Sequence, residues 1–247
     1  MLLADSLDSL EVERENIDVL ISRRVDAIVI SPLHRTKSRP ALVSAAQLLP
    51  VIQFDRIAAA SLPYVGVDQY GAMTKLLDHL EAGGRSRIAY VGSDTGESTA
   101  AERLTAFRDW TAARNLPQGY SLTPSTMEGG TSAARRILAR RPDVDAIACC
   151  NDVIAIGVLF HLGARGIAVP GEVAVTGFDN TIGSQLCRPT LTTATQPLEE
   201  VARQAVAWAQ SADPPPERRA VLDATIEIRE STVGRTAAGL NRPGAPE

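Results

Sequence analysis

The chain has 247 residues, of which 45% are hydrophobic and 22% are charged, and its formal net charge is −4. This length suffices for one large or two small domains with a buried core, and the composition is that of an ordinary globular protein. The acidic balance and the lack of a dense Lys/Arg run exclude strong nucleic-acid binding by these residues themselves.

The cysteines form no disulfide or metal-binding pattern. They are Cys149, Cys150 and Cys187, and three histidines are scattered along the chain. Adjacent cysteines make a poor structural bridge, so we expect free thiols, a cytoplasmic location and no metal or other cofactor. We expect no membrane association, because no apolar run approaches the roughly 20 residues that span a bilayer. The first residues also lack the pattern of a signal peptide.

The first quarter of the chain alternates between short apolar runs and runs with helical spacing. It predicts strands at 1–4, 25–31, 50–54 and 64–67, and helices at 5–24 and 40–48. Such an order is typical of an α/β domain with a mostly parallel sheet.

A second α/β series follows. It predicts strands at 87–91, 144–150 and 173–178 and helices near 73–82, 100–107, 132–140 and 155–162. A late helix near 198–208 is expected to break at Pro214–Pro216, followed by a β-rich run at 221–228. The Gly/Pro/Ala-rich end, 233–247, is predicted to be a disordered tail.

Polar pairs follow two of the predicted buried strands at their carboxyl ends. Asn151 and Asp152 follow the run 144–150, and Asp179 and Asn180 follow the run 173–178. In open α/β sheets, ligands bind just outside these strand ends. The alternative is local: Asp152 caps the next helix and Asp179 makes an Asx-turn.

The same stretch carries a family resemblance. CNDVIAIGVLFHLGARGIAVPGEVAVTGFDN resembles the signature of the lactose-repressor (LacI/GalR) family of bacterial transcription regulators. Further similar segments occur in the expected order up to about Thr232: SRRVDAIVISP, LPVIQFDR, PYVGVDQYGAM, HLEAGGRSRIAYVG, STAAERLTAFRDW, RPTLTTATQP and IEIREST. The resemblance implies a two-lobed, periplasmic-binding-protein-like α/β fold, with mostly parallel sheets flanked by helices and a ligand cleft between the lobes.

The resemblance also implies the lobe boundaries. The N-terminal lobe is expected to hold 1–67, with 197–217 returning to it, and the C-terminal lobe 68–196, with 218–232 returning. The family's helix-turn-helix headpiece, and the first strand and helix of its ligand domain, are expected to be missing before Met1. Met1–Ala4 would then be the family's second strand.

Six residues match ligand-facing positions of the family. They are Asp55, Thr99, Arg103, Asn151, Asp179 and Gln196. A guanidinium, carboxylates, amides and a hydroxyl can together bind a hydroxyl-rich or otherwise polar molecule.

Each match has a structural alternative. Asp55 could instead pair with Arg56, Arg103 could be a solvated helix-surface charge, and Gln196 could belong to a hinge. Asp68, by contrast, is expected to cap a helix rather than to bind ligand.

Two positions depart from relatives that bind sugars or phosphates. Ser125 stands where an aromatic side chain often supplies a face for a sugar ring. Glu97 stands where some relatives have a cation, which makes a phosphate ligand less expected.

The sequence thus predicts the effector-binding and dimerisation domain of a LacI-type regulator. A sugar or other small polar metabolite would control DNA binding through the missing headpiece, and the protein would be a homodimer. The alternative is a solute-binding protein of a sugar transporter. We expect no enzyme, because no nucleophile elbow, P-loop or dinucleotide fingerprint is present.

Overall fold

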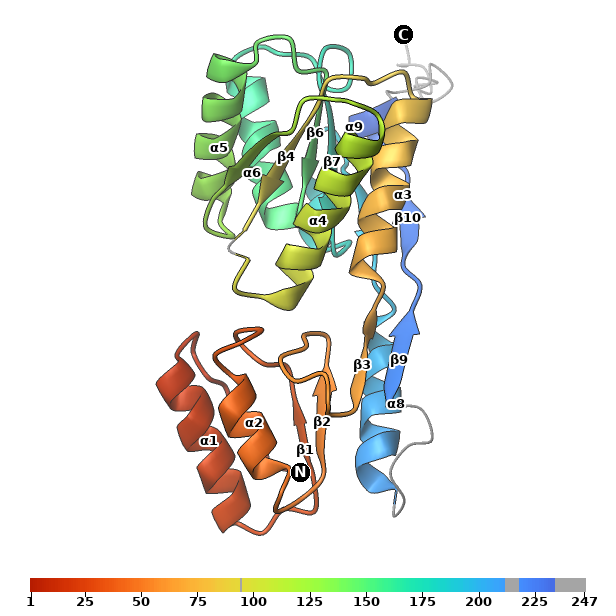
Figure 1. The fold of residues 1–247 in the computed structure, drawn as a ribbon. Coiled ribbons are helices and arrows are strands. Elements are labelled where there is room, and N and C mark those ends of the chain that lie inside the picture. The colour runs from red at the N-terminus through yellow and green to blue at the C-terminus, as the bar shows by residue number, and fades with distance from the viewer. Residues whose placement is uncertain (94, 212–217, 234–247) are drawn as a thin grey trace, which may run out of the picture. The chain divides into compact units, whose positions relative to one another are not determined.

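The structure, a computed structural model, describes residues 1–93, 95–211 and 218–233 (Figure 1). These residues divide into two compact units, each assembled from separate segments of the chain. As far as it is described, unit 1 comprises Met1–Met73, Asp94–Phe107 and Gln196–Thr225, and unit 2 comprises Thr74–Ser93, Arg108–Thr195 and Ile226–Glu247. This division into units does not test the lobe boundaries expected from the sequence, which stay a prediction.

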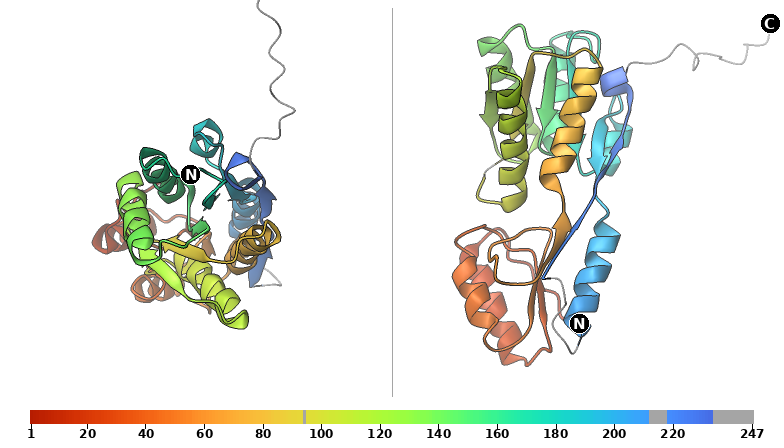
Figure 2. Two further views of the ribbon diagram at one scale, coloured as in Figure 1. Left: turned by 90° about the horizontal axis from the view of Figure 1, so that it is seen from above. Right: turned by 45° about the vertical axis from the view of Figure 1, so that its right-hand side comes forward.

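Unit 1 contains a parallel sheet whose described strands run in the order β1-β2-β3-β9. The strands are β1 (Ile28–Ile30), β2 (Val51–Phe54), β3 (Tyr64–Val67) and β9 (Arg219–Leu222). Helices α1 (Leu10–Ser22) and α2 (Arg39–Ala45) contact each other. Helix α8 (Leu198–Gln210) packs against β1, β2 and β3 (Figure 2).

The core of unit 1 is apolar, and one buried carboxylate lies at its margin. Ile17 of α1, Leu42 of α2 and Val51 of β2 belong to one cluster of buried side chains. Glu13 of α1 is only 3% exposed, and its carboxylate accepts the Leu33 N–H at 2.7 Å. This bond ties α1 to the segment after β1.

Unit 2 contains a larger sheet, with described strands in the order β10-β8-β7-β6-β4-β5. The pairings β5–β4, β4–β6, β6–β7 and β7–β8 are parallel. The strands are β4 (Ile88–Gly92), β5 (Gly119–Leu122), β6 (Ala146–Cys149), β7 (Ala174–Phe178), β8 (Thr192–Thr195) and β10 (Thr225–Glu227). Every residue of β4, β6 and β7 is buried, as expected for parallel strands covered on both faces.

The remaining helices are α3 (Gln69–Ala82), α4 (Ser98–Ala113), α5 (Met127–Arg140), α6 (Asp152–Ala164), α7 (Ile182–Leu186) and α9 (Glu230–Val233). Helices α5 and α6 meet through backbone. A Cβ at Gly130 would lie 2.1 Å from the Ile154 carbonyl oxygen, and one at Gly157 would lie 2.1 Å from the Met127 carbonyl oxygen. Only glycine permits this approach.

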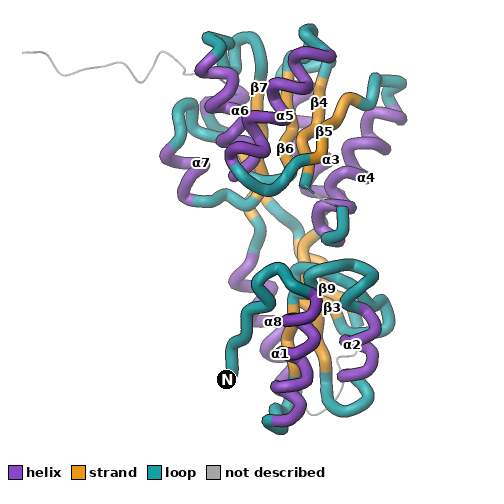
Figure 3. The backbone as a smooth tube through the Cα atoms, turned by 90° about the vertical axis from the view of Figure 1, so that its left-hand side faces the viewer, coloured by secondary structure: helices purple, strands orange, loops and turns teal. Residues whose placement is uncertain are grey.

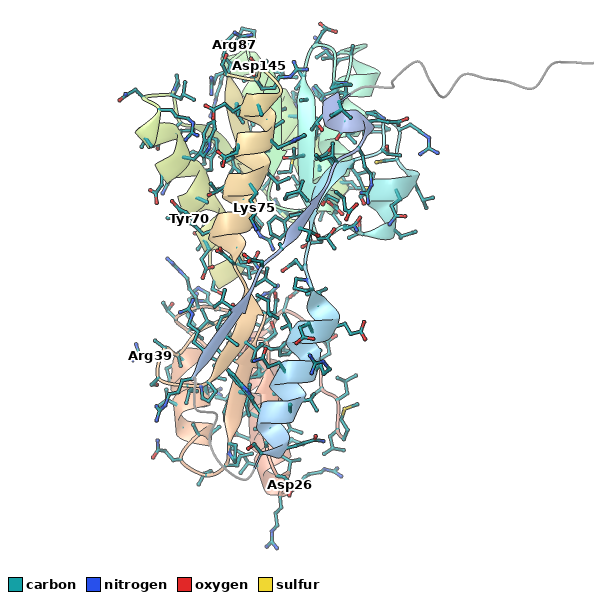
Figure 4. The ribbon with its side chains drawn as sticks, turned by 90° about the vertical axis from the view of Figure 1, so that its right-hand side faces the viewer. Asp26, Arg39, Tyr70, Lys75, Arg87 and Asp145 are labelled. Atoms are coloured by element: carbon teal, nitrogen blue, oxygen red, sulfur yellow. The ribbon has the colours of Figure 1, made fainter. Side chains whose placement is uncertain are left out.

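The amino ends of β4 and β6 are joined by a carboxylate. Asp145 accepts the N–H groups of Ser86 and Arg87 at 3.2 and 2.9 Å. Its carboxylate also lies 3.3 Å from the Arg87 guanidinium (Figure 4). This pair therefore aligns β4 and β6 at their amino ends, opposite to the carboxyl ends where ligand is predicted to bind.

The predicted α/β class is confirmed, and apart from the strand at Met1–Ala4 the strands and helices predicted from apolar spacing are present with shifted ends. Strands β5 and β8 and the short helices α7 and α9 were not predicted. The break expected at Pro214–Pro216 and the tail expected at 233–247 lie outside the described residues, except for Val233, which ends α9.

The strand predicted at Met1–Ala4 is wrong. The segment forms neither helix nor strand, and the side chains of Met1 and Leu3 are fully exposed. Within the described residues, β1 pairs only with β2. Leu2 and Leu3 instead line a groove of about 440 Å³ with residues of β1. Apolar character alone therefore did not make this segment a strand.

The expectation of free thiols is confirmed: Cys149 and Cys150 are buried and Cys187 is half-buried, all three unbridged. Among the described residues, no group of three or more His, Cys, Asp or Glu side chains is placed to hold a metal ion. None of the described helices combines the length and apolar character needed to cross a lipid bilayer.

We predict that β1 is less protected from amide exchange than β2. It forms one edge of the described sheet, and Val29 is 37% exposed, whereas β2 has a strand on each side. Amide hydrogen exchange at 28–30 should be roughly tenfold or more faster than at 51–54, because edge amides open more easily. Strand β7, central in its own sheet, is the slow reference. Equal protection of all three strands would show that the β1 edge is covered in solution.

Candidate functional site

The predicted site residues stand where parallel strands end or on the helix that follows one. Asp55 follows β2, Asn151 follows β6, Asp179 follows β7 and Gln196 follows β8. Thr99 and Arg103 lie one turn apart on α4, which follows β4. The structure thus confirms the strand-end positions that the sequence pattern indicated.

Asp55 lies in a strained turn at the end of β2. Its φ is +60°, its N–H donates to the Val65 carbonyl at 2.9 Å, and its carbonyl accepts the Tyr64 hydroxyl at 3.0 Å. Burial raises the pKa of the Asp55 carboxyl, while Arg56, Arg103 and a hydrogen bond from Ser31 act in the opposite direction. The backbone is therefore fixed, while the charges of Arg56 and Arg103 act on the carboxylate.

The suggested ion pair of Asp55 with Arg56 is a weak one. The Arg56 Nε lies 3.9 Å from the Asp55 carboxylate, too far for a hydrogen bond. A second nitrogen of Arg56 lies 3.1 Å from the Glu97 carboxylate. Glu97 is thus the closer partner of this guanidinium, which leaves Arg56 less available to an anionic ligand.

Arg103 is buried, so the alternative of a solvated helix-surface charge is wrong. It is 7% exposed, and its Nε donates to the Gln69 side-chain oxygen at 2.8 Å. The Gln69 amide in turn donates to the Gln196 side-chain oxygen at 3.0 Å. Two predicted residues, Arg103 and Gln196, are therefore joined through Gln69, which was not predicted.

Gln69 had only a weak signal in the sequence. It is the first residue of α3 and is fully buried, although glutamine is mostly an exposed residue. The preceding residue, Asp68, accepts the Gly71 N–H at 2.8 Å and so caps α3, as predicted. The only local indication of a role for Gln69 was its place beside the capped start of a helix.

Asn151 caps α6, and Asp152 does not. The Asn151 side-chain oxygen accepts the Ile154 N–H at 2.9 Å, and its amide nitrogen donates to the Ser125 hydroxyl at 3.2 Å. The expectation that Asp152 caps this helix is therefore wrong, because its carboxylate binds Thr181 and Thr193 instead. The contact places Ser125 beside a predicted ligand residue.

Asp179 begins a turn in which two residues in a row have positive φ. Asp179 has φ +104° and Asn180 has φ +50°. The Asp179 N–H donates to the Ala194 carbonyl at 2.8 Å, and the Arg229 guanidinium donates to the Asn180 side-chain oxygen at 2.6 Å. Strained backbone of this kind persists only where the surroundings fix it, and it is common at binding sites.

The structure brings the six residues together only in part. Asp55, Thr99, Arg103 and Gln196 belong to unit 1, and Asn151 and Asp179 belong to unit 2. Thr99 is 7% exposed and lies on the same face of α4 as Arg103. Each unit thus presents carboxylate and amide groups suited to hydroxyls and amines on a ligand.

Comparison with known proteins gives a consistent family. The model of the periplasmic binding protein-like domain matches residues 77–232. The HTH-type transcriptional regulator GalR of Salmonella typhimurium is 30% identical, over 97% of this chain and 72% of GalR.

Two solved structures are similar over most of the chain. The transcriptional regulator CelR in complex with cellobiose is 28% identical, with a TM-score of 0.79, over 90% of this chain and 71% of that chain. The transcription regulator GntR from Chromobacterium violaceum is 29% identical, with a TM-score of 0.84, over 94% of this chain and 88% of that chain.

We predict that Gln69 stabilises unit 1 through its two side-chain bonds. Gln69→Leu leaves the buried Arg103 Nε–H without this acceptor, which should cost about 1–3 kcal/mol of unfolding free energy. Urea unfolding followed by fluorescence measures the loss. The matched control is Gln47→Leu, since Gln47 is exposed and should change stability little. An equal effect of both substitutions would show that the Arg103–Gln69–Gln196 chain contributes no stability.

Proposed function

Because this chain belongs to the LacI/GalR family of bacterial transcriptional regulators, we propose that it binds a polar small-molecule effector that controls transcription. The relatives are named as regulators, which favours this role over solute binding for a transporter and over catalysis. The observation that carries the proposal is the buried Arg103, which Gln69 holds among polar strand-end groups. We assign DNA binding to a helix-turn-helix headpiece and not to the residues of this chain, whose net charge is −4.

A neutral, hydroxyl-rich effector fits the side chains better than an anion does. Asp55 and Asp179 offer carboxylates, which accept from hydroxyls and repel anions. The Arg56 guanidinium is already paired with Glu97 at 3.1 Å. The similar CelR structure holds cellobiose, a neutral disaccharide. We therefore propose a sugar or a comparable polyhydroxylated metabolite, contacted by Asp55, Thr99, Arg103, Asn151, Asp179 and Gln196.

Substitution of Arg103 and Asp179 tests the effector site. Calorimetry with a panel of neutral mono- and disaccharides, cellobiose included, and with sugar phosphates should first identify a neutral ligand. Arg103→Ala should then weaken its binding by roughly 1.5–3 kcal/mol, about ten- to 150-fold. Asp179→Asn should weaken it similarly while keeping the backbone, because asparagine tolerates positive φ.

The matched control is Arg108→Ala on the same helix. Arg108 is exposed and lies over the Tyr120 ring, 4.8 Å from its centroid. This variant should bind the ligand as the parent does. Unchanged affinity in both site variants would reject the site, and tighter binding of a sugar phosphate than of any neutral sugar would reject the ligand class.

We further propose that the protein is a homodimer and that α6 and α7 form a pairing surface. Helix α7 lies beside α6 (Figure 3), and a Cβ on Gly183 would be 2.9 Å from Ile156. Phe160, Ile182 and Leu186 on these helices are 67%, 70% and 69% exposed. Exposed apolar side chains grouped on two contacting helices favour an interface, and a second copy presents the same patch in a two-fold arrangement.

Charge on this patch should separate the copies. Phe160→Glu with Leu186→Glu should raise the dimer dissociation constant at least about tenfold, because pairing would bury both carboxylates. Sedimentation equilibrium gives the constant. Val206→Glu on α8, also an exposed apolar position, should leave it unchanged. A dimer that resists the double substitution would place the interface elsewhere.

A further inference from the structure

One fully buried carboxylate joins three segments at the ligand end of unit 2. Asp152 is 0% exposed. One of its oxygens accepts the Thr193 hydroxyl of β8 at 2.6 Å, and the other accepts both the N–H and the hydroxyl of Thr181 at 2.7 and 3.0 Å. Because Asp152 is the first residue of α6, its carboxylate links α6, β8 and the segment after β7.

The neighbouring strand leaves room for this carboxylate. A Cβ on Gly177 of β7 would lie 2.3 Å from an Asp152 oxygen, so any side chain there would displace it. Burial raises the pKa of the Asp152 carboxyl, while the bonds from Thr193 and Thr181 and the charge of Arg229 oppose the rise. The close fit and the three donated bonds make Asp152 a fixed point of unit 2.

Thr181 connects Asp152 to the Asp179–Asn180 turn and to α7. It directly follows the Asp179–Asn180 turn and is the N-cap of α7. Its hydroxyl makes no capping bond to α7, since it donates to Asp152. The turn that presents Asp179 and the first residue of α7 are therefore held by one carboxylate.

A second group holds the same segments from the other side. The Arg229 guanidinium donates to the Asn180 side-chain oxygen at 2.6 Å, to the Ser184 hydroxyl of α7 at 3.0 Å and to the Leu191 carbonyl at 2.9 Å. Turn and helix thus share two polar anchors, Asp152 and Arg229, so a shift of either alone would break hydrogen bonds to these groups.

We propose that Asp152 is a positioning residue that makes the Asp179 turn and α7 move as one body. On the proposed function, a change at the effector carboxylate would thereby reach the apolar face of α7, which carries Ile182 and Leu186. Asp152 itself binds no effector, because it is fully buried by the protein.

Amide exchange measured by NMR on the full chain tests this. Asp152→Asn replaces one acceptor oxygen by an amide nitrogen, so Thr181 and Thr193 can no longer both donate to separate oxygens. Exchange at 179–181 and at 182–187 should accelerate together, at least about tenfold, while 88–92 stays unchanged. Thr181→Ser keeps both donors and should behave as the parent, and Thr181→Val should lie between the two.

The matched control for lost stability is Ser231→Ala. The Ser231 hydroxyl is also fully buried; it donates to the Val175 carbonyl at 2.6 Å and accepts the Thr192 N–H at 2.8 Å, but its bonds reach neither the turn nor α7. Ser231→Ala should not selectively accelerate amide exchange at 179–187. Equal acceleration in this control, or acceleration of the turn without α7 in Asp152→Asn, would overturn the proposal.

Sedimentation on the same variants separates this proposal from the proposed function. Asp152→Asn should raise the dimer dissociation constant at least about tenfold relative to Ser231→Ala. A parent chain that is monomeric throughout would refute the dimer surface, whereas the exchange data would still decide whether Asp152 couples the turn to α7.

Discussion

A buried polar group must find its partner inside the protein, and the candidate site residues of each unit depend on this requirement. In unit 1 the Arg103 guanidinium, the Gln69 amide and the Gln196 amide satisfy one another in a chain. In unit 2 the Asp152 carboxylate takes three donors from two threonines. The side chains proposed to bind the ligand are thus held in place by polar neighbours that cannot easily move.

This arrangement has an energetic logic for a regulator. Side chains that are already oriented lose little further entropy when a ligand binds, so more of the interaction energy appears as affinity. Asp55 and Asp179 also occupy positive-φ backbone held by strand pairing and side-chain bonds. A ligand that prefers one arrangement of these anchors can shift the population of states only by its difference in affinity between them.

The fold was predictable where burial follows apolar character. Strands β4, β6 and β7 are buried along their whole length, and their nearly continuous apolar runs revealed them. Strand β8 was missed because it is built largely of threonines, whose burial depends on distant partners: the Thr193 hydroxyl donates to Asp152, and the Thr192 hydroxyl to the Arg229 carbonyl. Met1–Ala4 shows the converse error, for apolar residues without a neighbouring ladder did not become a strand.

The site was predictable in its positions and not in its connections. The residues at strand ends follow from chain order, but the burial of Arg103 and the roles of Gln69 and Asp152 depend on partners 34 and 29–41 positions away along the chain. Family resemblance pointed to Arg103, and nothing local indicated that Gln69 would hold it. Long-range polar pairing leaves no periodic trace in a sequence, unlike the spacing of apolar faces.

The backbone contact between α5 and α6 has an evolutionary consequence. The inner face of α6 is constrained at Gly157, where any larger residue would collide with the Met127 carbonyl. Phe160, nearly one turn further along the helix, is 67% exposed on its outer face, so this position is less constrained than Gly157. If copies of the protein pair through this outer face, related regulators in one cell can diverge in partner choice while their cores stay alike. Within one helix, some residues would then be constrained by the fold, and others would vary with the choice of partner.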